Sequence, residues 1–321
     1  EAPPGWSGLY DAGQHLVISH QIAGQRIERC YTIASPPTRS GTLTITIKRH
    51  PDGVLSNWLH DTLRPGDRMR ARGPYGEFSL RAHPGERLLF LAAGSGLTPA
   101  MSMMRTLADT GSEVDVAFAY SARTPADIIF RRELAALPEQ GLRIRSAIMC
   151  EEDAPGEHWD GPKGRLSPEL LAWLVPDLAS REVFLCGPPG YMGAAIGILD
   201  GLGLAPDRIH QESFDLGAVA GPFADVDPAS AVESRPVRIE LRLSGTQITC
   251  PADSTVLDAV LDAGVILQSS CRQGLCGTCK LTLLEGEVDM RHQGGIRPRE
   301  IGRGMFLPCC SRPLGDLVLE A

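Results

Sequence analysis

Three cysteines near the C-terminus lie close enough in the sequence to bind one metal centre together. Cys271, Cys276 and Cys279 have the spacing C-x4-C-x2-C, and the pair Cys309-Cys310 follows after a long interval. This is the ligand spacing of a plant-type 2Fe–2S cluster. A zinc site is the alternative, but zinc usually takes two C-x2-C pairs and the sequence has one. We therefore predict a 2Fe–2S cluster, which accepts and passes one electron at a time.

Two glycine-containing turns upstream have the composition of phosphate-binding loops. Gly94-Ser-Gly96-Leu-Thr98-Pro99 follows an apolar run and precedes a helix-like stretch. Glycines let backbone N–H groups approach a pyrophosphate, and a helix N-terminus adds its dipole. Pro99 replaces the third glycine of the G-x-G-x-x-G pattern, so a tight strand-to-helix turn explains this stretch equally well. A second turn, residues 186–190, at the same predicted sheet edge favours a dinucleotide-binding crevice.

A parallel sheet is needed to bring these two turns together. Between residues 86 and 212, apolar or β-branched runs alternate with helix-like stretches. Leu88–Ala93 is continuously apolar, as expected for a strand buried on both faces. The alternation predicts an α/β doubly wound domain. The expected strands cover residues 88–93, 114–120, 142–149, 182–186 and 208–212, and the expected helices cover 100–109, 126–137, 168–174 and 191–201.

A different pattern, of short strands separated by Gly, Pro and Asp, precedes this domain. It predicts a small antiparallel β-barrel with strands at 15–19, 27–33, 43–48 and 68–72, and one helix at 56–63 with Ser56 as its N-cap. Arg29, Tyr31 and Thr32 put a cation, an aromatic ring and a hydroxyl on one strand, although an exposed Arg beside a packed Tyr is the simpler explanation of these residues alone. The stretch Gly53–Ser56 is suited to phosphate.

The cysteine-rich segment belongs to a further domain. Residues 216–234 are rich in Ala, Gly, Pro, Asp and Ser and have no periodicity, which indicates a linker. A hairpin is expected at 237–250, followed by a capped helix at 253–263 that ends at Gly264.

Composition narrows the possible partners and the compartment. The 321 residues suggest two or three domains, and the net charge of −8 argues against a nucleic-acid partner. No apolar run approaches the ~20 residues of a membrane span, and the chain does not open with a secretory signal pattern. Nine cysteines is an odd number, and those outside the predicted cluster are scattered. We expect a reducing, cytoplasmic location without membrane contact.

The ordered motifs Arg-x-Tyr-Thr, Ile-Lys, Gly-x-x-Ser, Gly-Ser-Gly-Leu-Thr-Pro, Cys-Gly-Pro-Pro and Glu-x-Phe resemble the ferredoxin–NADP reductase superfamily. With its C-terminal cysteine loop, the chain is similar to reductase components of Rieske-type oxygenases and to hybrid-cluster-protein reductases. Within these, it most resembles the glycine betaine and carnitine monooxygenase reductase group. The resemblance implies a flavin-binding antiparallel β-barrel at 1–84, an α/β doubly wound nucleotide domain at 85–215, the linker, and an α+β (β-grasp) ferredoxin domain at 235–321. Such proteins normally carry another barrel strand ahead of Tyr10–Gln14, so the first strand is expected to be absent or truncated.

The resemblance also implies roles for single residues. Arg29 would contact the flavin phosphates, Tyr31 would lie against the isoalloxazine, and Thr32 would lie near its N5 atom. In ferredoxins the fourth cluster ligand follows a Leu-x pair, which selects Cys309. Neighbouring side chains in extended chain point to opposite sides, which leaves Cys310 as a spare thiol in a packed or semi-exposed position. The other implied contacts are Thr46, Ile47 and Lys48 with the ribityl and phosphate groups, Val54, Leu55 and Ser56 with the pyrophosphate, Gly94, Gly96, Thr98, Pro99, Gly187 and Pro188 with the nicotinamide nucleotide, Cys186 with the nicotinamide, and Glu212 and Phe214 with the flavin edge; Tyr31, Thr32, Thr98, Cys186 and Glu212 form the implied catalytic group.

The implied function is that of an NAD(P)H-dependent electron-transfer reductase, which passes electrons through flavin and the cluster to a terminal oxygenase or another protein. FAD is favoured over FMN because Gly53–Trp58 resembles FAD-binding members. NADH is favoured over NADPH because only Arg123 follows the second strand as a partner for a 2′-phosphate, and it could instead cap the following turn. Two other functions stay open: a diaphorase or flavin reductase with a small-molecule acceptor, and a redox sensor without turnover.

Overall fold

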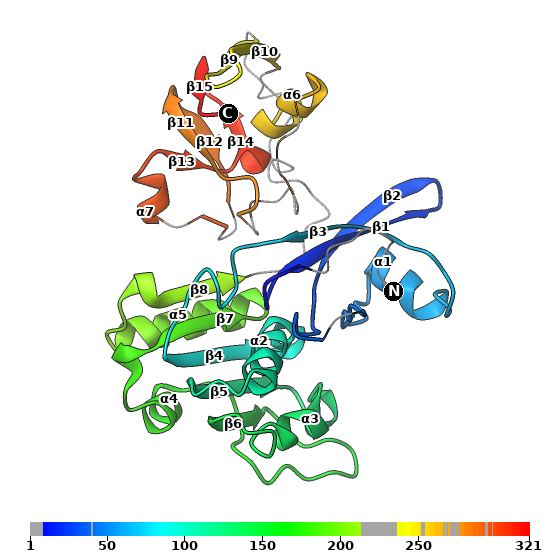
Figure 1. Ribbon diagram of the computed structural model, residues 1–321, viewed down its shortest axis with the longest axis vertical. Helices are drawn as coiled ribbons and strands as arrows, with labels where there is room; N and C mark the ends of the chain where they lie inside the picture. The colour runs from blue at the N-terminus through cyan, green and yellow to red at the C-terminus, as the bar shows by residue number, and fades with distance from the viewer. Residues whose placement is uncertain are drawn as a thin grey trace. The chain divides into compact units, whose positions relative to one another are not determined.

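The chain divides into two compact units, Glu1–Phe214 and Asp215–Ala321, drawn from blue to green and from yellow to red in Figure 1. This computed structural model describes residues 9–39, 41–212, 236–251, 254–265, 267, 269, 274, 277–292, 295–296 and 298–321. The predicted boundary between residues 84 and 85 lies inside the first unit. The predicted linker lies outside the described residues. Both therefore stay predictions.

The first unit begins with a three-stranded antiparallel sheet in the order β2-β1-β3. Its strands are β1 His15–Ile22, β2 Gln25–Thr32 and β3 Arg70–Tyr75. The side chains of Leu16, Ile18 and Tyr31 pack from this sheet against Leu55 and Leu59 of helix α1, Val54–Asp61. This is the predicted antiparallel flavin-type domain, and it holds α1 against the strand that carries Tyr31.

Two local predictions in this domain are wrong. Residues 43–48 form no strand, because their pairing is limited to one bridge, Ile33 with Ile45, and Thr44 N–H donates to the Ser35 hydroxyl at 3.1 Å. Ser56 is not an N-cap. It lies inside α1, and its hydroxyl donates to the Gly53 carbonyl at 3.2 Å, while Gly53 itself has the extended backbone of the N-cap position. The strand expected at 68–72 lies two residues further on.

The second part of this unit is a parallel sheet, as predicted, and its five strands have the order β6-β5-β4-β7-β8. Side chains of β4 alternate between two cores: Leu88 and Phe90 pack into one, and Leu89 and Leu91 into the other. This alternation explains why the strand has a continuous apolar sequence. The strands are β4 Arg87–Ala93, β5 Asp115–Ala122, β6 Ile144–Cys150, β7 Glu182–Cys186 and β8 Ile209–Glu212.

Helices cover both faces of this sheet (Figure 1). The α-helices are α2 Leu97–Asp109, α3 Arg131–Ala136, α4 Pro168–Leu174 and α5 Pro189–Gly201, and the short 3-10 turns are η1 Gly94–Gly96, η2 Pro125–Asp127, η3 Leu178–Ser180 and η4 Pro206–Arg208. Helix α4 matches its predicted range. Helix α2 starts three residues earlier than expected, and the helix expected at 126–137 is divided into η2 and α3.

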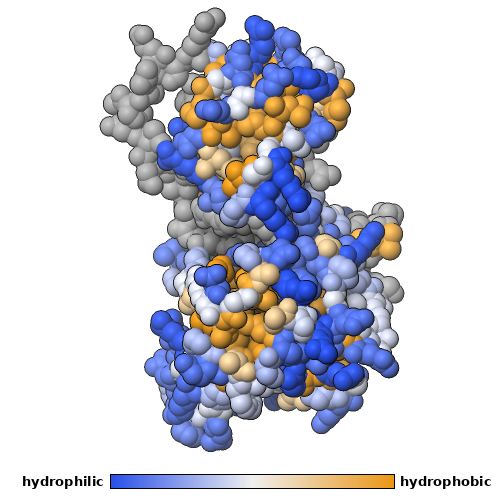
Figure 2. All heavy atoms as spheres, turned by 90° about the vertical axis from the view of Figure 1, so that its left-hand side faces the viewer, coloured by the Kyte–Doolittle hydropathy of each residue, from blue (hydrophilic) through white to orange (hydrophobic). Residues whose placement is uncertain are grey.

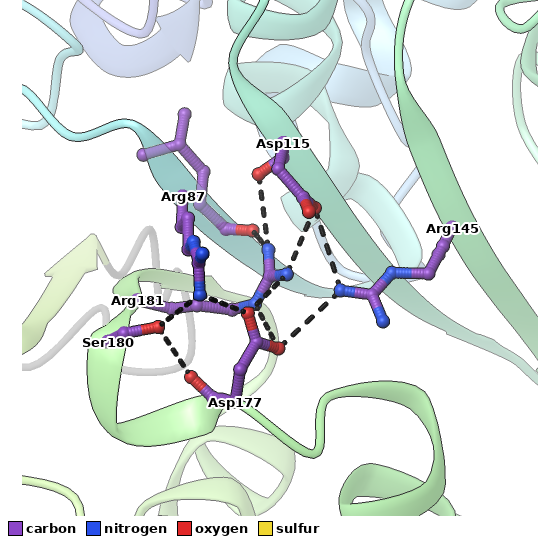
Figure 3. A network of polar contacts seen from close by, with 7 residues as sticks. Arg87, Asp115, Arg145, Asp177, Ser180 and Arg181 are labelled. Carbon is purple, nitrogen blue, oxygen red and sulfur yellow. Dashed lines mark hydrogen bonds and ion pairs between the residues drawn. The ribbon is translucent and has the colours of Figure 1, made fainter.

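A buried arginine, Arg181, forms hydrogen bonds near the amino ends of the parallel strands (Figure 3). The Arg181 side chain is fully buried and donates to both carboxylate oxygens of Asp177, at 3.0 and 2.9 Å. It also donates to the Asp115 carboxylate at 2.9 Å and to the Leu88 carbonyl at 2.8 Å. The exposed Arg87 and Arg145 contact the same carboxylates. This network lies at the edge opposite to the predicted nucleotide-binding turns.

The second unit is an α+β domain around a mixed sheet in the order β10-β9-β15-β11-β13. Helix α6, Val256–Asp262, packs Val256 and Val260 against Ile239 and Leu319. Its N-cap is Thr255, whose hydroxyl accepts from Asp258 N–H at 3.1 Å, so the helix begins later than expected. The other elements are β9 Val237–Leu241, β10 Thr246–Cys250, β11 Leu281–Glu285, β12 Val288–Met290, β13 Met305–Phe306, β14 Ser311–Pro313, β15 Leu317–Leu319, α7 Pro298–Ile301 and the 3-10 turn η6 Pro308–Cys310.

Hydrophobic residues are exposed among hydrophilic ones on the face of each unit that Figure 2 shows. Among the described residues, large exposed apolar side chains include Trp173 in the first unit, and Leu243 and Leu314 in the second. The helices within the described part of the chain are all too short or too polar to cross a membrane.

Candidate functional site

One face of the antiparallel sheet meets the last strand of the parallel sheet. Leu16 and Tyr31 are cross-strand partners in the core of the antiparallel domain. Because strand side chains alternate, the next pair, His15 and Thr32, points to the opposite face. There the His15 Nδ1 atom lies 3.3 Å from Oε1 of Glu212, the last residue of β8. The predicted residues Thr32 and Glu212 thus share one neighbour.

Glu212 in turn lies beside Cys186, its backbone partner on β7. Both side chains are buried. Burial raises the pKa of the Cys186 thiol, and the nearby Glu212 charge raises it further. Burial also raises the pKa of Glu212, whereas the hydrogen bond and charge of His15 act in the opposite direction. Cys186 is therefore a neutral thiol at this site, without the thiolate character of a nucleophile.

Three buried polar atoms of these predicted residues have no hydrogen-bond partner among the described residues: Thr32 Oγ1 and Glu212 Oε2 on the His15 side, and Tyr31 OH on the other face of the sheet. Burial raises the pKa of Tyr31 to about 12, so its hydroxyl stays protonated. Unpaired buried polar groups are rare in native proteins, so each one points to a partner such as a bound water, ion or ligand. An isoalloxazine offers ring N–H, C=O and nitrogen acceptors together with an aromatic face, so these residues fit a flavin.

The two predicted glycine turns contact each other at the carboxyl edge of the sheet. A Cβ atom added to Gly96 would lie 2.4 Å from the Cys186 carbonyl oxygen and 2.7 Å from Gly187 Cα. Only a glycine permits this backbone approach. Thr98 is buried, and its hydroxyl donates to the Ser95 carbonyl at 3.0 Å. This hydrogen bond stabilises the turn. The backbone N–H groups of such a turn, at the start of a helix, suit a nucleotide phosphate.

A lysine from the antiparallel domain reaches the first of these turns. Gly94 has a left-handed backbone with φ of 53°. The Lys48 ammonium lies 3.9 Å from the place where a Cβ atom on Gly94 would stand. The Gly94 carbonyl accepts from Tyr120 OH at 3.1 Å. The turn thus has a cation beside it, which suits an anionic ligand.

The other residues predicted to contact the cofactors differ in their burial and in whether their polar groups are already hydrogen-bonded. Leu55 is 1% exposed and packs in the core of the antiparallel domain, so only its backbone could meet a ligand. The Ser56 hydroxyl is engaged with Gly53 and with His50 N–H. Arg29 donates to the Glu28 carbonyl at 2.7 Å. Thr46, Ile47 and Gly187 are partly buried, Pro99 is buried, Val54 and Pro188 are exposed, and Phe214 lies outside the described residues.

Sequence reasoning missed His15 and Gly76. His15 is fully buried, and Gly76, with φ of 104°, closes over it. A Cβ atom on Gly76 would lie 3.1 Å from His15 Nδ1 and 3.4 Å from Glu212 Oε1. The available signal was an ionisable residue at the start of the apolar stretch Leu16–Ile18. The contact with Glu212, 197 residues away, could not be read from it.

The second unit brings two of the predicted cluster ligands into one core. Cys279 and Cys309 are both buried and pack with Leu257 and Leu307. Gly277 has φ of 70°, and an added Cβ atom would lie 2.6 Å from the Gly295 carbonyl oxygen. These buried thiols and the tight glycine backbone fit a 2Fe–2S cluster. The other two predicted ligands, Cys271 and Cys276, lie outside the described residues.

The backbone around Cys309, the predicted fourth ligand, is not extended. Pro308–Cys310 forms the 3-10 turn η6, so the expected alternation of Cys309 and Cys310 about an extended strand is wrong. Cys310 is fully buried, which excludes the semi-exposed alternative. Its sulfur lies 2.6 Å from the place of a Cβ atom on Gly274, which itself has φ of 70°. Cys310 thus packs against the cysteine loop.

Comparison with known families divides the chain into three parts. The oxidoreductase FAD-binding domain matches residues 8–80, the oxidoreductase NAD-binding domain matches 90–196, and the 2Fe-2S iron-sulfur cluster binding domain matches 239–314. The chain is 37% identical to the glycine betaine monooxygenase reductase subunit of Pseudomonas aeruginosa, over 97% of this chain and 87% of that protein. The stachydrine N-demethylase reductase subunit of Rhizobium meliloti is 38% identical, over 100% and 91%. The chain belongs to the oxygenase-reductase type of the ferredoxin–NADP reductase superfamily.

Solved structures agree with this family. Phthalate dioxygenase reductase matches with a TM-score of 0.57 and 26% identity, over 97% of this chain and 88% of that one. Full-length CYP116B46 from Tepidiphilus thermophilus matches with a TM-score of 0.72 and 29% identity, over 97% of this chain and 38% of that longer one. The predicted fold class is confirmed. The protein is an oxidoreductase that takes electrons from NAD(P)H through flavin to a 2Fe–2S centre.

Proposed function

We propose that this protein is the cytoplasmic, NADH-dependent reductase of a Rieske-type monooxygenase, with FAD as its flavin. The observation that carries the proposal is the meeting of Thr32, Cys186 and Glu212 around buried, unpaired polar atoms in a chain that also holds the cluster domain. The glycine betaine monooxygenase reductase subunit of Pseudomonas aeruginosa named above supports an oxygenase as the acceptor. The flavin converts a two-electron donor into one-electron steps, which the cluster requires.

Residues of the first unit would bind and orient both cofactors. We assign the isoalloxazine to Tyr31, Thr32 and Glu212, with the Thr32 hydroxyl and Glu212 Oε2 as its polar partners. The turn Gly94–Pro99 and the turn beginning at Cys186 would hold the nicotinamide nucleotide, with backbone N–H groups toward its phosphates. The buried Cys186 thiol would limit how closely the nicotinamide packs and would exclude water. No general base is required of these residues.

Preference for NADH is supported by the charges after β5. A 2′-phosphate needs several basic groups or a bidentate arginine. The cap of the turn η2 is Thr124, whose hydroxyl donates to Asp127 at 2.8 Å, so Arg123 is not the capping residue. Arg123 is exposed, and its carbonyl accepts from Glu152 N–H at 3.0 Å. A single arginine next to a turn whose Asp127 carboxylate is already bonded to Thr124 is a poor site for an added phosphate.

The cluster would be held by Cys271, Cys276, Cys279 and Cys309 and would be the exit for electrons. Buried Cys279 and Cys309 support the last two of these assignments. A diaphorase would not need this second unit.

Steady-state reduction of cytochrome c by purified protein tests the proposal. We expect sustained turnover with NADH, a kcat/KM for NADH at least tenfold above that for NADPH, and NADH-dependent product formation when a Rieske-type oxygenase purified with it is added. A preference for NADPH would overturn the nucleotide assignment. If the protein reduces small acceptors but supports no product formation by any Rieske-type oxygenase that is added, the partner assignment is overturned.

A further inference from the structure

Among the described residues, His15 makes the one charged contact between the antiparallel sheet and β8 at the proposed flavin site. Sequence reasoning did not single out this residue. Its Nδ1 atom lies 3.3 Å from Glu212 Oε1, and neither side chain is more than 4% exposed. A buried carboxyl with one oxygen engaged has its plane and rotamer fixed by that contact. The other oxygen, Oε2, is the one that has no partner among the described residues.

Every element packed around His15 restricts the imidazole. Thr32 is its cross-strand neighbour on β2, and Tyr75 is its neighbour on β3, with ring centroids 6.3 Å apart. Gly76 leaves no room for a side chain beside Nδ1. The titratable groups facing the pair are Cys30 of β2, which hydrogen-bonds His15, Tyr75 of β3, and Cys186 of β7. The imidazole therefore has a defined orientation, as a positioning group requires.

We propose that His15 is a positioning residue that holds Glu212 Oε1, so that Oε2 is presented to the flavin. The contact also keeps the Glu212 carboxyl in one protonation state. This inference rests on the proposed flavin site and deepens it. Without His15, Glu212 would be a buried carboxyl with neither a charge partner nor a fixed orientation, and its proton would then depend on the pH of the medium.

The direction of the His15 titration agrees with this geometry. Burial by itself lowers the pKa of His15, but hydrogen bonds to Cys30 and Glu212 and the Glu212 charge outweigh burial and raise the pKa to about 10. A histidine whose pKa is raised on folding contributes stability fully below its unfolded pKa of about 6.5, and this contribution is lost as the pH rises through the folded value.

Variants with and without the hydrogen bond test the proposal. His15→Asn keeps an N–H donor near the position of Nδ1 but cannot carry a charge, and His15→Phe removes both. In anaerobic stopped-flow reduction by saturating NADH, we expect the limiting rate of flavin reduction to fall about tenfold or more in His15→Phe, with partial recovery in His15→Asn. The KM for NADH should change less than threefold, and bound FAD should stay near one per chain.

A double-mutant cycle shows whether His15 acts through Glu212. If it does, His15→Phe combined with Glu212→Gln should be no slower than Glu212→Gln alone. Multiplying losses, or a wild-type rate in His15→Phe, would overturn the proposal. His20→Asn is the matched control, because His20 lies on the same strand, stacks on Trp58 at 3.8 Å, and should leave the rate unchanged.

A readout on the flavin-free protein covers the case in which a variant binds FAD poorly. The difference in Tm between wild type and His15→Asn should shrink by more than half between about pH 6 and about pH 10, because wild type loses the contribution of the pair over this range. A difference independent of pH would overturn the pairing of His15 with Glu212. Failure of the proposed function itself would appear elsewhere: wild-type protein would not bind FAD or be reduced by NADH.

Discussion

Replacing Arg181 with alanine should destabilise the first unit strongly without changing the proposed flavin site. The guanidinium is fully buried and makes five hydrogen bonds, two to Asp177, two to Asp115 and one to the Leu88 carbonyl. Removing one partner of a buried ion pair costs about 3–5 kcal/mol. Here Asp115 and Asp177 keep side-chain exposures of 33% and 27%, and Arg87 and Arg145 stay beside them, so we expect the lower end, about 3 kcal/mol.

For a unit of this size, about 3 kcal/mol lowers Tm by about 6–12 °C. Arg87→Ala is the matched control, since Arg87 contacts the same Asp177 but is 52% exposed, and its loss should cost less than about 1 kcal/mol. Thermal unfolding followed by near-UV circular dichroism measures both variants. A decrease in Tm for Arg181→Ala no larger than that for Arg87→Ala would refute the reasoning. At 25 °C, kcat with NADH should be unchanged, because the network lies at the opposite edge of the sheet.

The pH dependence gives a second check on the same residue. Burial disfavours the ionised form of Asp177, but the hydrogen bonds and charge of Arg181 outweigh it and lower the pKa of Asp177. A lowered carboxyl pKa contributes stability above the unfolded value of about 3.9, and this is lost as the pH falls through the folded value. The gap in Tm between wild type and Arg181→Ala should therefore be constant near neutral pH and should narrow below about pH 4.

Three further predictions concern the cofactor sites. Cys309→Ala should abolish the visible absorption and the reduced-state EPR signal and lower bound iron, whereas Cys310→Ala should keep all three; the reverse result would show that the ligand register is off by one. Gly96→Ala should raise the KM for NADH at least tenfold, because its Cβ atom would lie 2.4 Å from a backbone oxygen of Cys186, whereas Gly193→Ala, with open space around it, should change the KM less than twofold. Cutting the chain near Val232 should preserve NADH-dependent reduction of ferricyanide and impair that of cytochrome c; unchanged cytochrome c reduction would exclude the cluster as the exit for electrons.

Much of the architecture is encoded in local sequence patterns. The ranges of β7 and α4 agree with prediction, because a continuous apolar strand and a helix that begins Ser-Pro-Glu depend on nearest neighbours along the chain. The glycine turns were recognisable because a left-handed residue or a close backbone approach requires glycine wherever it occurs. The order of these motifs was enough to indicate the family and the three cofactors.

The tertiary structure decided what depends on distant contacts. Residues 43–48 have a strand-like sequence, but their pairing is limited to the Ile33–Ile45 bridge, and the Thr44 N–H donates to the Ser35 hydroxyl. Cys310 was expected to point away from Cys309 because the chain was taken as extended, but the two residues lie in a 3-10 turn, and the Cys310 sulfur packs against Gly274. The resemblance of the sequence motifs to a known family was enough to name Thr32, Cys186 and Glu212 as candidates for one site. That a buried histidine joins this site could be decided only by folding, since β1 and β8 are 197 residues apart at their contact and local periodicity carries no information over that separation.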